Sequence, residues 1–146
     1  MKPLDFYELG LQIAGSATSE AQHRTVANRV YYGLHHESCC RYFRTELSPN
    51  PLNRNRRHTD LRDRFNQPDN PNAGAIGQLL GNLMTLRTEA DYQLTPPLRY
   101  RNRSYSSDQL MRLATGIGED LLEALETYSP GEAPDGCRCP QGYSTG

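Results

Sequence analysis

Apolar residues recur every three or four positions along most of the chain, which is the spacing of amphipathic helices. Helices are predicted over about Pro3–Ala14, from after Ser19 to about Glu46, and over about Arg56–Phe65, Ala75–Tyr92 and Asp108–Tyr128. Alternating β-branched runs are missing, and two Val and three Ile in the whole chain give a sheet little to be built from. Short connections between such helices predict an all-α fold, an up-and-down bundle of four to five helices.

Residues rich in Pro, Asn and Gly interrupt these segments. Turns are expected over residues 48–53 and 67–74, and a basic connector that contains two prolines is expected over residues 94–105. Residues 129–146 are rich in Pro, Gly and Ser and show no apolar period. We therefore predict one helical domain over residues 1–128 and a disordered C-terminal tail over residues 129–146.

Composition limits the function classes. Hydrophobic residues make up 36% of the chain, and no stretch approaches the ~18 consecutive apolar residues of a membrane span. The first dozen residues carry Asp5 and Glu8 and lack the apolar core of a secretory signal, so the cytoplasm is the expected compartment. Cys39-Cys40 and Cys137-x-Cys139 fit zinc spacings poorly, so we expect reduced thiols, no metal and no cofactor.

The net charge of −1 hides an asymmetry. Residues 24–112 hold fourteen Arg against eight acids, whereas residues 113–146 hold one Arg against six acids. A basic body suits an anionic partner, and the arginines alternate with Tyr100 and Tyr105, which suits stacking of unpaired RNA bases. The residues predicted to contact RNA are Arg54, Arg56, Arg57, Arg101 and Arg103. The alternative is local pairing, because Asp60 and Asp63 lie within the first basic run.

The second predicted helix carries a polar stripe of three residue types. Arg29 and His36 are seven residues apart, so they share a face about 10 Å apart, and Tyr32 lies between them. A histidine can move a proton to or from a ribose hydroxyl, and a guanidinium can stabilise the charge of a pentacoordinate phosphate. His35 points about 100° away from this face. The alternative is a solvated Arg29 and a structural His36.

The segment Arg29-Val-Tyr-Tyr-Gly-Leu-His-His36 resembles the R-x-Y-Y-x-x-x-H pattern of the HEPN superfamily. A second segment, Leu86-Arg-Thr-Glu-Ala-Asp-Tyr92, is similar to the L-R-x-x-A-D-Y element of a later helix in such proteins. The resemblance covers roughly residues 5–128. It implies a dimeric helical bundle in which the Arg and His of both protomers meet in one cleft.

The resemblance also implies a function. Many members are metal-independent endoribonucleases that act as toxins or defence effectors, often beside a nucleotidyltransferase antitoxin. By position, Arg29 would stabilise the phosphate, His36 would be the acid/base, and Tyr32 and Asp91 would support them. Asp91 is also expected to pair with Arg87, four residues before it. The alternative function is a non-catalytic module that binds a nucleotide or a nucleotidyltransferase, which Val30 after the Arg favours.

Overall fold

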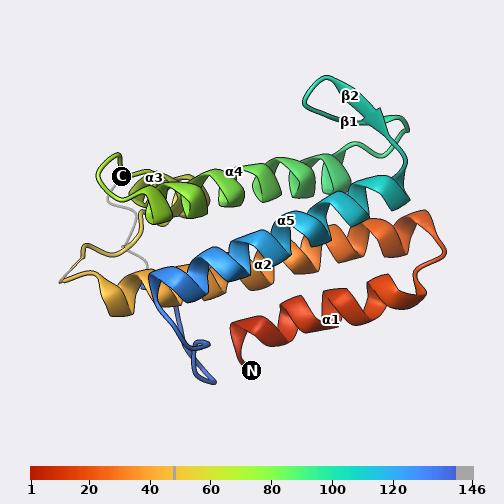
Figure 1. Ribbon diagram of the computed structural model, residues 1–146. Helices are drawn as coiled ribbons and strands as arrows, with labels where there is room; N and C mark the ends of the chain where they lie inside the picture. Colours follow the sequence, from red (N-terminus) through yellow and green to blue (C-terminus); the bar gives the residue numbers. More distant parts are fainter. Residues whose placement is uncertain (48, 141–146) are drawn as a thin grey trace.

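The computed structural model describes residues 1–47 and 49–140. Within them the chain is mostly helical, with five helices and one small hairpin (Figure 1). The elements are α1 (Pro3–Ser16), α2 (Glu20–Thr45), α3 (Arg57–Phe65), α4 (Pro71–Tyr92), β1 (Leu98–Tyr100), β2 (Arg103–Tyr105) and α5 (Ser107–Tyr128). Each predicted helix is present, and the all-α prediction is confirmed at that level.

Capping side chains set where the long helices begin. Ser19 accepts the Gln22 N–H while the Gln22 side chain accepts the Ser19 N–H, so both orphan donors at the start of α2 are satisfied. Asn70 caps α4 in a similar way by accepting the Ala73 N–H, and Pro71 occupies the first helical position. The predicted loop over 67–74 is therefore too long, because Asn70 and Pro71 start α4 inside it.

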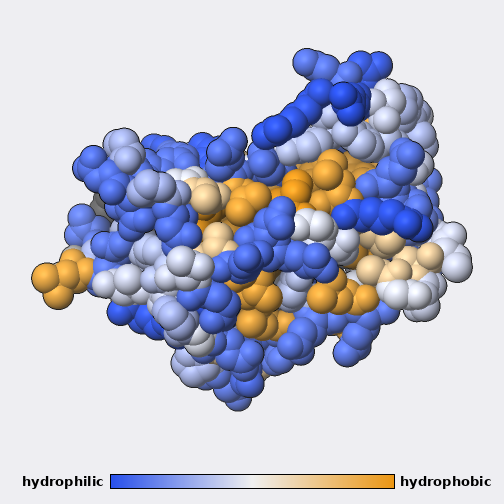
Figure 2. Space-filling view, in the orientation of Figure 1, coloured by the Kyte–Doolittle hydropathy of each residue, from blue (hydrophilic) through white to orange (hydrophobic). Residues whose placement is uncertain are grey.

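The long helices lie side by side, and successive ones run antiparallel (Figure 1). The central helix α2 packs against α1, α4 and α5, and its apolar side supplies the middle of the core. On the face drawn in Figure 2, apolar residues gather between the helices, with hydrophilic residues around them. The burial of the apolar sides of several helices in the core is the main source of stability in such a bundle.

The hairpin β1–β2 corrects the prediction of a connector without strands. Its two turn residues, Arg101 and Asn102, have φ of 50° and 64°, the left-handed conformation that a two-residue hairpin turn requires. Asn tolerates this conformation well, and Leu98 and Tyr100 turn inward toward the bundle. Strands of three residues are too short for an alternating pattern to predict them.

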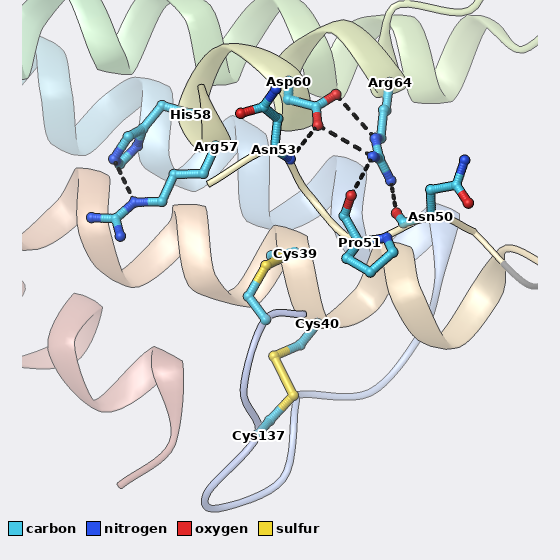
Figure 3. The surroundings of a disulfide bond; sticks show 11 residues. Cys39, Cys40, Asn50, Pro51, Asn53, Arg57, His58, Asp60, Arg64 and Cys137 are labelled. Atoms are coloured by element: carbon cyan, nitrogen blue, oxygen red, sulfur yellow. Dashed lines mark hydrogen bonds and ion pairs between the residues drawn. A yellow bond between two sulfur atoms is a disulfide. The ribbon is translucent and has the colours of Figure 1, made fainter. Parts of the chain in front are cut away.

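The segment after α5 corrects two further predictions. Residues 129–140 pack against the bundle, where Ala133 is fully buried, and residues 141–146 lie outside the described residues. The cysteines form two disulfides, Cys39–Cys139 and Cys40–Cys137, with Cα–Cα distances of 5.7 and 6.5 Å (Figure 3). The prediction of reduced thiols is thus wrong. Partners about 100 residues apart leave no local spacing that would indicate the pairing.

Candidate functional site

The predicted stripe on α2 is present, with Arg29, Tyr32 and His36 all partly buried on one face. The rings of Tyr32 and His36 are stacked with centroids 6.5 Å apart. Arg29 lies two turns from His36, and no contact between these two side chains appears within residues 1–47 and 49–140. A single chain therefore presents Arg29 and His36 on the same helix face but does not bring their side chains into contact.

Arg29 packs against α1 and borders a cavity. Its guanidinium carbon lies 5.5 Å from the centre of the Phe6 ring, over the ring face. Its Nε is buried with no hydrogen-bond partner in the described chain. A cavity of about 330 Å³ is lined by Arg29 together with Arg24, Asn28 and Asp91 among others. An arginine that shares no ion pair in the described chain is available for an anion.

Asp91 is held by two polar contacts at this cavity. It receives a hydrogen bond from Asn28 Nδ2 at 3.2 Å and pairs with Arg87 at 3.5 Å, which confirms the predicted i,i+4 pair. Arg87 in turn lies over the rings of Tyr31 and Tyr32, with its guanidinium carbon 5.2 and 5.4 Å from their centres. Asp91 thus holds Arg87, which in turn lies over Tyr32 of the stripe. No histidine contacts Asp91 in the described chain.

His36 lies at the opposite end of the stripe. It lines two cavities of about 190 and 270 Å³, and Cys137 of the C-terminal segment lines both with it. Burial and then the positive charge of Arg57 lower the pKa of His36 below its usual range. The imidazole is therefore neutral near pH 7 and able to accept a proton.

His35 occupies a different environment from its neighbour. Its side chain is 2% exposed, and its ring lies 4.4 Å from the ring of His58 and stacks on Tyr31 at 5.7 Å. Burial, followed by the nearby His58 and His36, holds its pKa well below the usual value. As the helix geometry predicted, His35 lies away from the face of Arg29, Tyr32 and His36; the structure shows that it is buried, whereas His36 borders the outer cavities.

His58 is a member of this cluster that sequence reasoning missed. Tyr31 Oη lies 2.5 Å from its Nδ1, and Arg57 Nε donates to its Nε2 at 3.3 Å (Figure 3). Burial and then Arg57 lower the pKa of His58 to about 4. His58 follows His35 by 23 positions, and a turn-rich segment lies between them, so no helical spacing links the two in the sequence.

The predicted RNA-binding arginines fall into two separate groups. Arg54, Arg56 and Arg57 line one cavity of about 300 Å³, together with His58, at the start of α3. Arg101 and Arg103 lie on the hairpin, at the other end of α4 (Figure 1). Arg101 donates to Asn82 at 3.1 Å and covers the Tyr100 ring. The arginines at the start of α3 thus form one positively charged pocket, and Arg101 and Arg103 of the hairpin are not part of it.

The predicted local pairing is also present in part. Asp60 is engaged by Arg64 at 3.1 Å and by the Asn53 N–H at 2.9 Å, and within the described residues it forms no ion pair with the pocket arginines (Figure 3). Asp63 lies 3.1 Å from Arg62 and 3.9 Å from Arg56. The second pair joins two exposed side chains, so it contributes little. The pocket keeps a net positive charge.

Comparison with protein-family models, with curated proteins and with solved structures finds no match. No group of three His, Cys, Asp or Glu side chains suited to a metal ion occurs within the described residues. No helix in this part of the chain combines the length and apolar character needed to cross a bilayer. The site must therefore be interpreted from its own geometry.

Proposed function

We propose that this protein is a metal-independent endoribonuclease of the HEPN type. The proposal depends on one observation, which is that α2 presents a general acid/base and a cation on one face. His36 is neutral and lines a cavity, and Arg29 has no carboxylate partner in the described chain. The helical architecture and the Arg-lined pocket beside the histidine cluster support it. The HEPN resemblance of residues 29–36 and 86–92 supplies the family.

The proposed reaction is attack of a ribose 2′-OH on the adjacent phosphorus. His36 accepts the hydroxyl proton, the new O2′–P bond forms, and the P–O5′ bond breaks. The same imidazole then gives the proton to the leaving 5′ oxygen, so the products are a 2′,3′-cyclic phosphate and a 5′-OH. A guanidinium at the phosphate stabilises the added negative charge of the transition state, which is the role of Arg29.

The distance between Arg29 and His36 makes a two-fold homodimer part of the proposal. Seven helical residues put the two groups about 10 Å apart, too far to share one phosphate, whereas a symmetry mate would supply the complementary group. Light scattering at tens of micromolar protein should show a dimer. A fully active monomer would contradict the shared site.

The decisive experiment is RNA cleavage in EDTA. The purified chain, assayed with and without a dithiol reductant, should cut single-stranded RNA in at least one of the two states and leave cyclic phosphate ends. In that state His36→Ala and Arg29→Ala should each lower the rate by about 10²-fold or more, as loss of a general acid/base does. Arg112→Ala is the matched control, because Arg112 is exposed on α5 and its one ion pair among the described residues is with Asp108. Activity that vanishes in EDTA and returns with Mg²⁺ would overturn the mechanism.

A toxin or defence role in the cytoplasm is the proposed biological setting, with a nucleotidyltransferase antitoxin as a proposed partner. Expression of the wild type should arrest growth, and expression of His36→Ala should not. The same pair of strains tests catalysis and toxicity together, because both depend on one imidazole. Arrest by the His36→Ala variant would show that toxicity does not require cleavage.

The second candidate function is a non-catalytic module that binds a nucleotide. The Arg54–Thr59 pocket, at about 300 Å³ with three arginines, has the size and charge to hold a phosphate group. Val30 gives this candidate no support in the structure, because it is fully buried in the core rather than facing the site. Titration calorimetry with a nucleoside triphosphate distinguishes the two functions when combined with the cleavage assay.

A further inference from the structure

The C-terminal segment after α5 runs back along α2 and is anchored in two different ways. Residues 129–135 are held by polar contacts. The Ser129 carbonyl accepts from Arg41 at 3.2 Å and from Arg44 at 2.8 Å, and the Ala133 N–H donates to the buried Glu37 at 2.8 Å. These contacts are independent of the cysteines, so this part stays docked whatever their oxidation state.

Residues 137–140 are held to the bundle mainly by the two disulfide bonds. Cys137 and Cys139 are bonded to Cys40 and Cys39, and the only other hydrogen bond to the bundle in this described stretch is from the Leu52 N–H to the Pro140 carbonyl. Arg138 is exposed, and its side chain forms no hydrogen bond or ion pair within the described chain. The position of Cys137, Arg138 and Cys139 therefore depends mainly on the two disulfides, while Pro140 is also held by Leu52.

The sulfur-held residues lie over the candidate acid/base. Cys39 and Cys40 follow His36 by three and four residues, which places them on the next turn of α2 above the imidazole. Cys137, Arg138 and Cys139 form one cavity wall with His36, and Cys137 borders it again in a second cavity near the N-terminus. His36 is partly buried, and it shares its two cavities with this segment and with Pro3 and Phe6 of α1.

We propose that residues 137–139 are a redox-controlled cover: the two disulfides hold them over His36, and reduction releases them and opens the imidazole to a polynucleotide. As regulation of cleavage this rests on the proposed function, but the cover itself is measurable without RNA. Cytosolic disulfides are usually transient or redox-sensing. In the cytosol the protein would therefore be mostly reduced with His36 uncovered, and oxidation would form the disulfides and cover His36.

The chemistry requires a dithiol reductant. Its thiolate attacks one sulfur of a disulfide and forms a mixed disulfide. Its second thiol then displaces the cysteine, so one S–S bond breaks in the protein and one forms in the reductant, with two electrons and two protons transferred. Both bonds together take four electrons. Attack is open at Cys137 and Cys139, which are partly exposed, whereas Cys39 and Cys40 are 0% and 5% exposed.

Four cysteine thiolates can hold structural zinc in other proteins, so the test first establishes that these cysteines are present as disulfides. When the protein purified without reductant is unfolded in denaturant and treated with iodoacetamide, no cysteine should be alkylated. Its mass should be four hydrogens below the mass of the reduced protein. Four alkylated cysteines with one bound zinc per chain would overturn the cover.

The test measures how fast diethyl pyrocarbonate modifies His36, followed by peptide mass mapping. The modification rate should rise severalfold when dithiothreitol reduces the wild type, while that of the 2%-exposed His35 stays unchanged. The double variant Cys137→Ser/Cys139→Ser should show the high rate without reductant and no further response to it. Circular dichroism establishes that this variant is folded.

The outcomes separate this proposal from the endoribonuclease. An unchanged His36 rate on reduction, or a parallel rise at His35, would overturn the cover, the second because it indicates general loosening. A selective rise at His36 without RNA cleavage in either redox state would support the cover and overturn the proposed function. Cleavage that appears only on reduction, together with the selective rise, supports both.

Discussion

Tyr31 Oη lies 2.5 Å from Nδ1 of His58, and this contact joins the middle of α2 to the first turn of α3. Because the Arg57 guanidinium can only donate, the His58 Nε2 must accept, so the neutral ring carries its proton on Nδ1 and donates it to the phenol. Burial and then Arg57 keep this ring neutral by lowering its pKa to about 4. The contact thereby links the packing of α3 to the charge state of the histidine cluster.

Stability should therefore fall in mildly acidic solution. The pKa values of His35, His36 and His58 are lowered in the folded state, whereas an unfolded histidine titrates near ~6.5. Below that pH the unfolded chain binds protons that the folded chain does not, so the free energy of unfolding declines as pH drops from about 6.5 toward 4 and is level above it. Urea unfolding at several pH values should show this, with a shallower decline for His58→Gln. Identical slopes would contradict the assignment.

The buried Glu37–Arg41 pair should be costly to break. Both side chains are 0% exposed; Nε of Arg41 lies 2.9 Å from Glu37, and a second nitrogen lies 2.7 Å from Glu126. Removing Arg41 leaves a buried carboxylate uncompensated, so Arg41→Ala should lower the free energy of unfolding by about 3–5 kcal/mol. In the exposed pair on α5, Arg112→Ala should change it by less than about 1 kcal/mol. Equal losses in denaturant unfolding would refute the argument.

Two glycines should respond to alanine with opposite sign. A Cβ at Gly33 would lie 2.6 Å from the backbone nitrogen of Tyr7, so α1 must move away from α2, at a cost of about 1–3 kcal/mol. A Cβ at Gly116 meets nothing within 4 Å, so Gly116→Ala should stabilise α5 by about 0.5–1 kcal/mol. Thermal melts of the two variants decide the point. A Gly33→Ala protein as stable as the wild type would show that the α1–α2 approach is looser.

The two disulfides should contribute to stability in a strongly non-additive way. Each joins residues about 100 positions apart, spanning 100 and 97 residues, and closing one such loop already holds the other pair of ends together. Removing one pair by Cys→Ser should therefore cost little, whereas removing all four cysteines should cost about 2–5 kcal/mol. Urea unfolding without reductant measures the three variants. Losses that simply add would show that each bond acts on a separate loop or relieves strain.

The adjacent histidines should differ in their effect on RNA cleavage. His35 is buried against His58 and Tyr31, so His35→Phe should keep the stacked packing and most of the activity. His36 borders the cavities that it shares with Cys137, so its replacement by Ala should reduce cleavage by about 10²-fold or more while the melting temperature stays close to that of the wild type. A folded but inactive His35→Phe together with an active His36→Ala would move the site to His35.

The sequence predicted the helices and the α2 stripe because both depend on local chemistry. The reciprocal cap of Ser19 and Gln22 lies within one turn, and the separation of Arg29, Tyr32 and His36 follows from helical pitch alone. The Arg87–Asp91 pair is likewise an i,i+4 contact. Such features need no knowledge of how the helices pack, so one chain is enough to predict them.

Only the tertiary structure decided which distant residues meet. His58 reaches His35 and Tyr31 from another helix, Cys39 and Cys40 find partners about 100 residues away, and residues 129–140 pack although no apolar period marks them. The arginines around the start of α3 and those of the hairpin both lie in basic runs of the sequence, yet they are located at opposite ends of α4 (Figure 1). These contacts arise from the packing of whole helices, whose relative placement depends on the burial of all their apolar faces at once rather than on any local spacing.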